Sequence, residues 1–135
     1  MNNIIAILLV GISLLTGCGN TDSAHDVVQK AEYKKISATE AKQMMESADD
    51  YILLDVRTEE EFIESRIEGA ILIPDREIRN RVETEIPEED TLIFVYCRSG
   101  GRSANAAKEL VSMGYTNVYD FGGIMNWPYG TVSGR

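Results

Sequence analysis

The most constraining feature of this sequence is a series of short apolar runs separated by segments with helical patterns. Residues 51–56 and 91–96 are almost uninterrupted apolar runs, which are typical of strands buried on both faces of a sheet. We expect further, shorter strands over residues 33–36, 69–74 and 117–121. We therefore expect an α/β fold in which helices cover a mostly parallel sheet of these strands.

The segments between the apolar runs carry helix signals. Ser37 and Thr58 each precede a glutamate by three positions, which is the capping-box pattern of a helix start. Ile78 and Val82 are spaced so that they share one face of a charged helix. A stripe of apolar residues predicts a further helix over residues 103–113.

Composition excludes several classes of function. The 135 residues carry a net charge of −9, which argues against a nucleic-acid-binding protein because such a protein needs a basic face. The single histidine, His25, lies near the N-terminus, so the main domain has no imidazole for Ser-His-Asp or Cys-His catalysis. The two cysteines, Cys18 and Cys97, are too few for a four-cysteine zinc site or a disulfide scaffold. We expect neither a metal nor a cofactor.

The N-terminal segment has the pattern of a processing signal. Residues 1–17 carry no charged side chain, and their apolar stretch is too short to cross a bilayer. Residues 15–18, Leu-Thr-Gly-Cys, resemble the bacterial lipoprotein signal, although Lys and Arg are missing from the first residues. The resemblance implies cleavage before Cys18, a diacylglycerol on its sulfur, and a stable membrane anchor. An ordinary secretory signal and an uncleaved apolar N-terminus are the alternatives.

The rest of the chain divides into three parts. Residues 18–32, which begin with the lipidated cysteine, are small and polar and are expected to form a flexible tether. Residues 33–129 form the domain, and residues 130–135 form a C-terminal tail. With the signal and the lipid, this organisation predicts a domain outside the cytoplasm, anchored to a bacterial membrane.

The loop after the second long apolar run is the strongest candidate for chemistry. Cys97 directly follows that run, and two glycines and two arginines come after it before the next helix. Glycines let the main chain curl so that its N–H groups surround an anion, and the helix N-terminus adds partial positive charge. We expect a thiol in this position to ionise readily, and Arg98 and Arg102 to attract an anionic substrate. The alternative is an inert buried cysteine.

A second polar group follows the other long run. Because active sites of such sheets lie at the carboxyl ends of the strands, Asp55 and Arg57 should lie near the cysteine loop. We expect Asp55 to anchor loop N–H groups or to pair with a basic residue, with direct proton transfer as the alternative. Arg57 and Glu61 are spaced to pair with each other, and Trp127 is expected to pack in the core.

Four segments of the chain resemble the single-domain rhodaneses, which are sulfurtransferases. Residues 97–103, Cys-Arg-Ser-Gly-Gly-Arg-Ser, resemble the active-site loop of that family. Residues 54–62, 67–74 and 122–127 resemble its other signatures and occur in the same order. The resemblance covers about residues 33–129 and implies a rhodanese-like fold with a five-stranded, mostly parallel sheet. One departure is the pair Ser-Arg at residues 65–66, where the family often has Gly-His.

The resemblance also implies roles for the loop residues. Cys97 would take sulfane sulfur as a persulfide and pass it to a thiol or another nucleophile. The donor would be a small anion such as thiosulfate or polysulfide. The residues implied in donor binding are Arg98, Ser99, Gly100, Gly101, Arg102 and Ser103, with Asp55 and Arg57 in support.

Two other functions remain open from sequence alone. Phosphatases and arsenate reductases use a related loop with an arginine six positions after the cysteine, where this chain has Ser103. A non-catalytic module that binds a partner would keep the fold without the reaction. A persulfide assay separates this module from a sulfurtransferase.

Overall fold

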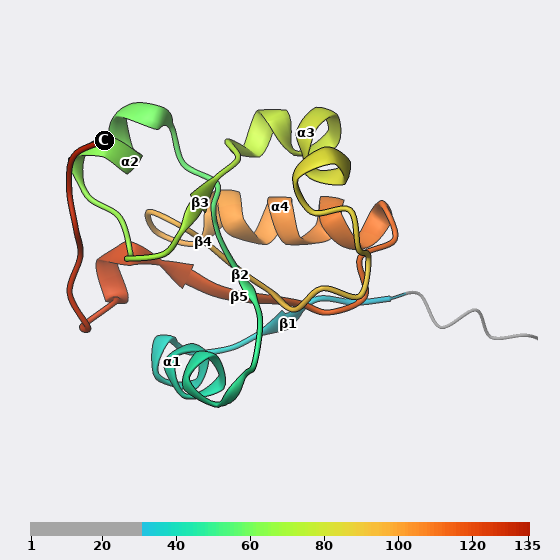
Figure 1. Cartoon of the computed structure of the whole chain (residues 1–135), viewed down its shortest axis with the longest axis horizontal. Coiled ribbons are helices and arrows are strands. Elements are labelled where there is room, and N and C mark those ends of the chain that lie inside the picture. The colour runs from blue at the N-terminus through green and yellow to red at the C-terminus, as the bar shows by residue number, and fades with distance from the viewer. Residues whose placement is uncertain (1–30) are drawn as a thin grey trace, which may run out of the picture.

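The computed structural model describes residues 31–135 and contains one parallel sheet (Figure 1). The sheet has five strands in the order β1-β5-β4-β2-β3, and every neighbouring pair is parallel. The strands are β1 (Lys34–Lys35), β2 (Ile52–Asp55), β3 (Ile71–Leu72), β4 (Ile93–Cys97) and β5 (Val118–Gly123). The expected α/β fold is confirmed.

Helices connect the strands, as the sequence predicts. They are α1 (Ala38–Ser47), α2 (Glu59–Glu64), α3 (Ile78–Glu85) and α4 (Gly101–Ser112), with short 3-10 turns η1 (Asp75–Glu77) and η2 (Ile124–Asn126). Both expected capping boxes are present, with Ser37 before α1 and Thr58 before α2. The last long helix begins at Gly101 instead of Ser103, because Gly100 takes a left-handed conformation (φ 110°) that ends the loop earlier.

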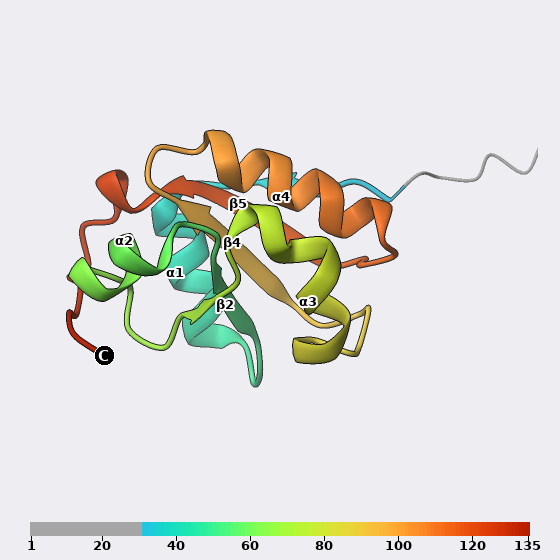
Figure 2. The same cartoon turned by 90° about the horizontal axis from the view of Figure 1, so that it is seen from above.

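The sheet separates two apolar clusters. Helix α1 covers one face, and α3 and α4 cover the other (Figures 1 and 2). The larger cluster lies under α3 and α4, and it includes Leu54, Val95, Cys97 and Leu110. The smaller cluster lies under α1 and contains Phe94, Tyr96 and Phe121. Strand β4 is buried along its whole length. Because successive side chains of a strand point to opposite faces of the sheet, alternate residues of β4 belong to opposite clusters.

The edge strands β1 and β3 are shorter than the sequence suggests. Each contains only two residues, although the strands predicted from the sequence extend over 33–36 and 69–74. A side-chain pattern shows where a strand can form, whereas the strand also needs a hydrogen-bonding partner for its main-chain groups. At Pro74 the chain lacks an N–H, so β3 ends shortly before it.

The C-terminal residues return to the domain. Arg66 and Val132 form an antiparallel bridge in which both main-chain N–H groups donate across 2.8 Å. The Arg66 guanidinium also donates to the carbonyl of Gly134 at 2.6 Å. The last residues therefore lie beside the connection between α2 and β3 (Figure 1).

The predictions for the N-terminal signal, the lipidated Cys18 and most of the tether lie outside the described residues. Within residues 31–135, no helix is long and apolar enough to cross a membrane.

Candidate active site

The strand order brings both predicted polar groups to the same end of the sheet. Strands β2 and β4 are neighbours, with Asp55 opposite Tyr96 in register. The segment after β2 and the loop after β4 therefore leave the sheet side by side at its carboxyl end, as expected for parallel strands. Cys97 and the Asp55–Arg57 pair lie at this end.

Cys97 is the last residue of β4, and only 1% of its surface is exposed. The main-chain N–H of Gly100 donates to its sulfur at 3.0 Å. The hydroxyl of Ser103, a fully buried residue in the first turn of α4, lies 3.5 Å from the same sulfur. The sulfur thus faces an amide, a hydroxyl and the N-terminal turn of a helix, all of which favour negative charge.

Ser103 links the sulfur to the main chain around it. Its hydroxyl lies 3.1 Å from the carbonyl of Gly100 and 3.3 Å from that of Gly122. A hydroxyl has one proton but two lone pairs. It can therefore accept from the Cys97 thiol while donating to a carbonyl, or donate to the sulfur after the thiol has ionised.

Gly123 on β5 packs directly against the cysteine loop. Gly123 lies opposite Cys97 in the sheet, where the register of β4 and β5 shifts. A Cβ on Gly123 would lie 2.0 Å from the Arg98 carbonyl oxygen, so only glycine allows the strand and the loop to approach this closely. The N–H of Met125 also donates to that oxygen at 3.3 Å. Sequence reasoning placed Gly123 in a family signature but not in the site.

Asp120 on β5 binds the main chain of Gly122, the residue before Gly123. Asp120 is fully buried, and its Oδ1 accepts from the N–H of Gly122 at 2.9 Å. The other oxygen, Oδ2, has no hydrogen-bond partner among the described residues. Sequence reasoning did not single out this residue, because a lone acid in a strand gives no signal of what lies opposite it.

Asp55 pairs with a basic residue, as expected, and also binds a main-chain N–H of the segment that follows β2. It accepts from the N–H of Arg57 at 2.9 Å and from the Arg57 guanidinium at 2.7 Å. Both side chains are almost fully buried, at 0% and 5% exposure. Burial disfavours the charge of Arg57, but the hydrogen bond and the charge of Asp55 outweigh it and raise the pKa of this guanidinium.

Two neighbours complete the buried pair. The carbonyl of Ser65 accepts from the Arg57 guanidinium at 2.6 Å. The Tyr96 ring lies 5.6 Å from the same guanidinium, and its hydroxyl accepts from the N–H of Ile67 at 3.2 Å. Burial, with the negative charge of Asp55, raises the pKa of Tyr96, so this phenol stays protonated.

The expected pair between Arg57 and Glu61 is wrong. Glu61 instead binds Arg102 through two hydrogen bonds of 2.7 and 2.8 Å. The fixed side chain of Arg57 explains this, because its guanidinium is already held by Asp55 and Ser65. The hydrogen bonds from Arg102 lower the pKa of Glu61 to about 2, with help from the main-chain N–H of Thr58.

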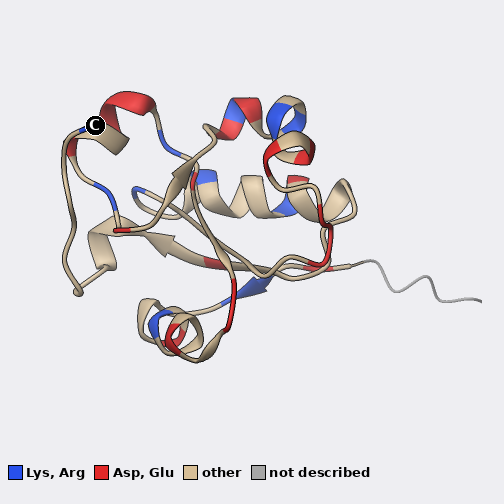
Figure 3. Cartoon of the chain, viewed as in Figure 1, with Lys and Arg blue, Asp and Glu red and all other residues tan. Residues whose placement is uncertain are grey.

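The remaining loop residues lie at the surface. Arg98 and Ser99 are exposed, as expected for side chains that meet the donor. Arg98 forms no ion pair within the described part of the chain. A cavity of about 260 Å³ lies beside the loop, with Arg57, Glu61 and Arg98 among its lining residues. The loop and α2 lie at the same end of the molecule, where Figure 3 shows basic and acidic residues together.

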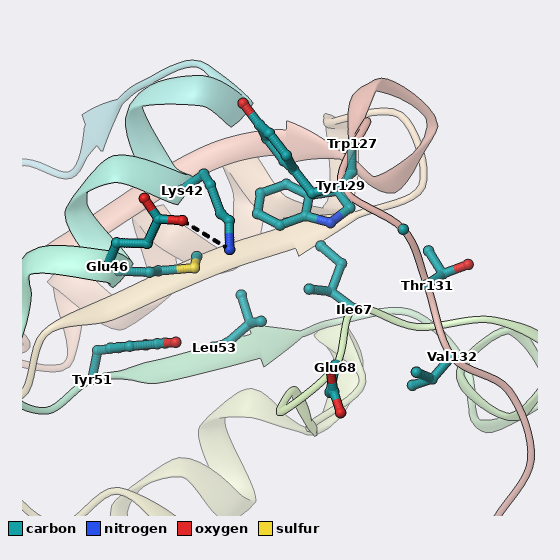
Figure 4. Close-up of a pocket in the computed structure, with 12 residues that line it drawn as sticks. Lys42, Glu46, Tyr51, Leu53, Ile67, Glu68, Trp127, Tyr129, Thr131 and Val132 are labelled. Carbon is teal, nitrogen blue, oxygen red and sulfur yellow. Dashed lines mark ion pairs between the residues drawn. The ribbon is translucent and has the colours of Figure 1, made fainter.

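Trp127 is half-buried instead of lying in the core, and it packs against the apolar cluster under α1. Its ring lies 5.4 Å from Phe121, a member of that cluster, and 4.9 Å from Tyr129. Cys97 belongs to the cluster on the opposite face of the sheet. Trp127 and Tyr129 line a separate cavity of about 400 Å³, where Lys42 and Glu46 form an ion pair (Figure 4).

Among residues 31–135, no three His, Cys, Asp or Glu side chains are grouped to hold a metal ion. The site therefore consists of the Cys97 sulfur beside an N–H donor and a hydroxyl, with the exposed Arg98 next to it in the loop. Such a group can act as a nucleophile toward a small anion, and can hold a negatively charged sulfur afterwards.

Comparisons with known proteins agree with this geometry. The family model of the rhodanese-like domain matches residues 37–128. The thiosulfate sulfurtransferase PspE of Escherichia coli is 36% identical over 81 residues, which cover 60% of this chain and 78% of PspE. A sulfurtransferase of Allochromatium vinosum is 35% identical over 94 residues, which cover 69% of this chain and 86% of that protein.

Solved structures show the same fold. A structure described as rhodanese with anions from E. coli superposes with a TM-score of 0.60 at 34% identity, covering 63% of this chain and 100% of that one. A rhodanese-related protein from Thermoplasma volcanium superposes with a TM-score of 0.63 at 34% identity, covering 74% and 98% of the two chains.

Proposed function

Because this chain belongs to the rhodanese-like family and is a rhodanese-type sulfurtransferase, we propose that Cys97 carries the transferred sulfur as a persulfide. The observation that carries the proposal is the place of the Cys97 sulfur, 3.0 Å from the N–H of Gly100 and 3.5 Å from the hydroxyl of Ser103. No imidazole is needed there, because fixed dipoles stabilise the charge that a base would otherwise create.

The first half-reaction loads the cysteine. The Cys97 thiolate attacks the outer sulfur of thiosulfate or of a similar sulfane donor. A new S–S bond forms on Cys97, the old S–S bond of the donor breaks, and its electron pair leaves with sulfite. The persulfide that remains carries one negative charge on its outer sulfur, which the N–H groups of the loop can stabilise.

The second half-reaction unloads it. An acceptor thiolate attacks the outer sulfur of the persulfide, and the electron pair of the bond that breaks returns to Cys97. The acceptor leaves as a persulfide, and no external oxidant or reductant is consumed. Arg98 and Ser99, which are exposed beside the loop, are the side chains expected to meet the donor first.

The phosphatase alternative gains no support. It requires an arginine six positions after the cysteine, and Ser103 occupies that position with its hydroxyl toward the sulfur. The nearest candidate, Arg102, is bound to Glu61 through two hydrogen bonds.

The test is a steady-state assay in which cyanide accepts sulfur from thiosulfate and forms thiocyanate. We expect turnover by the wild-type chain and none by Cys97→Ser. Equal turnover by the two proteins would refute the proposal. Hydrolysis of an aryl phosphate at a similar rate would instead favour phosphatase chemistry.

The location of the protein is a separate proposal. The pattern at residues 15–18 supports lipidation of Cys18, which would tether the domain outside the cytoplasm on a bacterial membrane. Metabolic labelling with a radioactive fatty acid tests this. We expect label on the wild-type chain, and label that persists in Cys18→Ala would contradict the proposal.

A further inference from the structure

We propose that Glu61 sets the charge of the sulfur donor that the Cys97 loop accepts. By occupying Arg102, it leaves the loop suited to a donor with one negative charge and poorly suited to a dianion. The inference rests on the proposed sulfur transfer at Cys97 and deepens it, because it names the class of donor that this site favours.

The ion pair between Glu61 and Arg102 is fixed on both sides. Arg102 uses two nitrogens to reach the two oxygens of Glu61, at 2.7 and 2.8 Å. Glu61 also accepts from the N–H of Thr58 at 3.0 Å, as part of the capping box of α2. The side chains are only 32% and 21% exposed. A bidentate pair held in this way does not release its guanidinium without losing both hydrogen bonds.

The consequence is a shortage of free positive charge at the loop. The loop carries Arg98 and Arg102, and Arg57 follows the neighbouring strand, but Arg57 is neutralised by Asp55, and Arg102 is neutralised by Glu61. Of these three arginines, only Arg98 has no carboxylate partner within the described residues. A thiosulfate dianion would therefore meet one uncompensated cation.

The cavity beside the loop strengthens this argument. Its lining includes Arg98 together with two acids, Glu61 and the exposed Glu64. The low pKa of Glu61, about 2, keeps its carboxylate charged at neutral pH. The net charge of −9 adds repulsion at longer range. A donor with a single charge, such as the persulfide of a thiol, meets less of this repulsion than a dianion does.

A comparison of two donors that break the same kind of S–S bond distinguishes the effect of donor charge from that of intrinsic donor reactivity. Thiosulfate carries two negative charges, whereas methanethiosulfonate carries one, and both give up their outer sulfur with an oxidised sulfur group as leaving group. The second-order rate of persulfide formation on Cys97 is measured for each donor, by stopped reaction and mass spectrometry, in wild type and Glu61→Gln.

The variant Glu61→Gln removes the charge and keeps the helix start, because glutamine also completes a capping box. With Arg102 released, we expect the thiosulfate rate to rise about fivefold relative to the methanethiosulfonate rate, as for loss of a partly exposed ion-pair partner. An unchanged ratio between the two donors would overturn the inference.

The matched control is Glu60→Gln, in the same helix turn. Glu60 is exposed and forms no ion pair in the described structure, so its replacement makes the same change in net charge without touching Arg102. We expect the donor ratio to stay at the wild-type value. An equal shift in both variants would mean that net charge alone governs the ratio, and the inference would fail.

A thermal unfolding curve shows whether Glu61→Gln folds. If it does not, a second variant tests the role of the ion pair. Arg102→Gln leaves Glu61 without its partner, so we expect the thiosulfate rate to fall relative to the methanethiosulfonate rate. A rise would overturn the inference. If wild type forms no persulfide with either donor, the proposed function fails, and the inference falls with it for that separate reason.

Discussion

The close approach of β5 to the cysteine loop can be tested by adding one methyl group. In Gly123→Ala the new Cβ would lie 2.0 Å from the Arg98 carbonyl oxygen and 2.7 Å from the Ser99 Cα. Because real contacts of this kind are essentially never shorter than 3.0 Å, the loop must move by about 1 Å. The backbone of Gly123 itself (φ −117°) suits any residue, so the effect comes from the contact and not from torsional strain.

The expected cost divides between stability and activity. Forcing a methyl group into a tightly packed place destabilises a fold by about 1–3 kcal/mol, which urea unfolding at neutral pH measures. A displacement of about 1 Å at a reacting atom lowers a rate by about 100-fold, so the thiosulfate:cyanide assay should show a loss of that order. Because a folded domain is typically stable by about 5–15 kcal/mol, a destabilisation of this size leaves most molecules folded and does not explain the loss of turnover.

Gly69→Ala is the matched control. Unlike Gly123, Gly69 has a positive φ of 84°, but nothing lies within 4 Å of an added Cβ, and the residue lies outside the cysteine loop. This change should cost about 1–2 kcal/mol of stability through strain, with no comparable loss of turnover. Gly123→Ala with normal turnover, or equal losses in both variants, would refute the claim that this contact shapes the loop.

Further predictions concern the two ion pairs at the site. Asp55→Asn leaves Arg57 buried without its counter-charge, so we expect a loss of about 3–5 kcal/mol in urea unfolding, and a loss below 1 kcal/mol would contradict the pairing. Glu61 has a pKa of about 2 in the folded chain against 4.5 for a free glutamate, so its stabilisation is complete above pH 4.5 and disappears as the pH falls toward 2. This contribution should be about 1 kcal/mol, because the pair is partly exposed, and Glu61→Gln should remove that part of the acid sensitivity seen in denaturation curves. A wild-type curve with the same slope as the variant would show that Glu61 carries no such linkage.

The general fold could be predicted because its signals are local. The apolar runs at 51–56 and 91–96 became the central strands β2 and β4, and the capping boxes at Ser37 and Thr58 mark real helix starts. Each signal depends on residues within a few positions of one another. The position of Cys97 at the end of β4, before a glycine-rich turn, is also local, so the candidate nucleophile could be named from sequence.

The partners around the site could not be predicted in the same way. Glu61 lies four positions from Arg57, yet it binds Arg102, which is 41 positions away. The choice depends on the buried contacts of Arg57 with Asp55 and Ser65, which fix its guanidinium before Glu61 can reach it. Likewise, the need for glycine at position 123 comes from the Arg98 carbonyl on another strand end. Both facts depend on how distant segments meet.

The most direct test of the central claim is to measure, by mass spectrometry, the mass of the peptide that contains Cys97. The wild-type protein is treated with thiosulfate, separated from excess donor and digested without reductant. The Cys97→Ser variant is treated in the same way. We predict that the wild-type peptide gains the mass of one sulfur atom, that cyanide removes it, and that the serine variant gains nothing. A wild-type peptide of unchanged mass would contradict the account, as would extra sulfur located on any other residue.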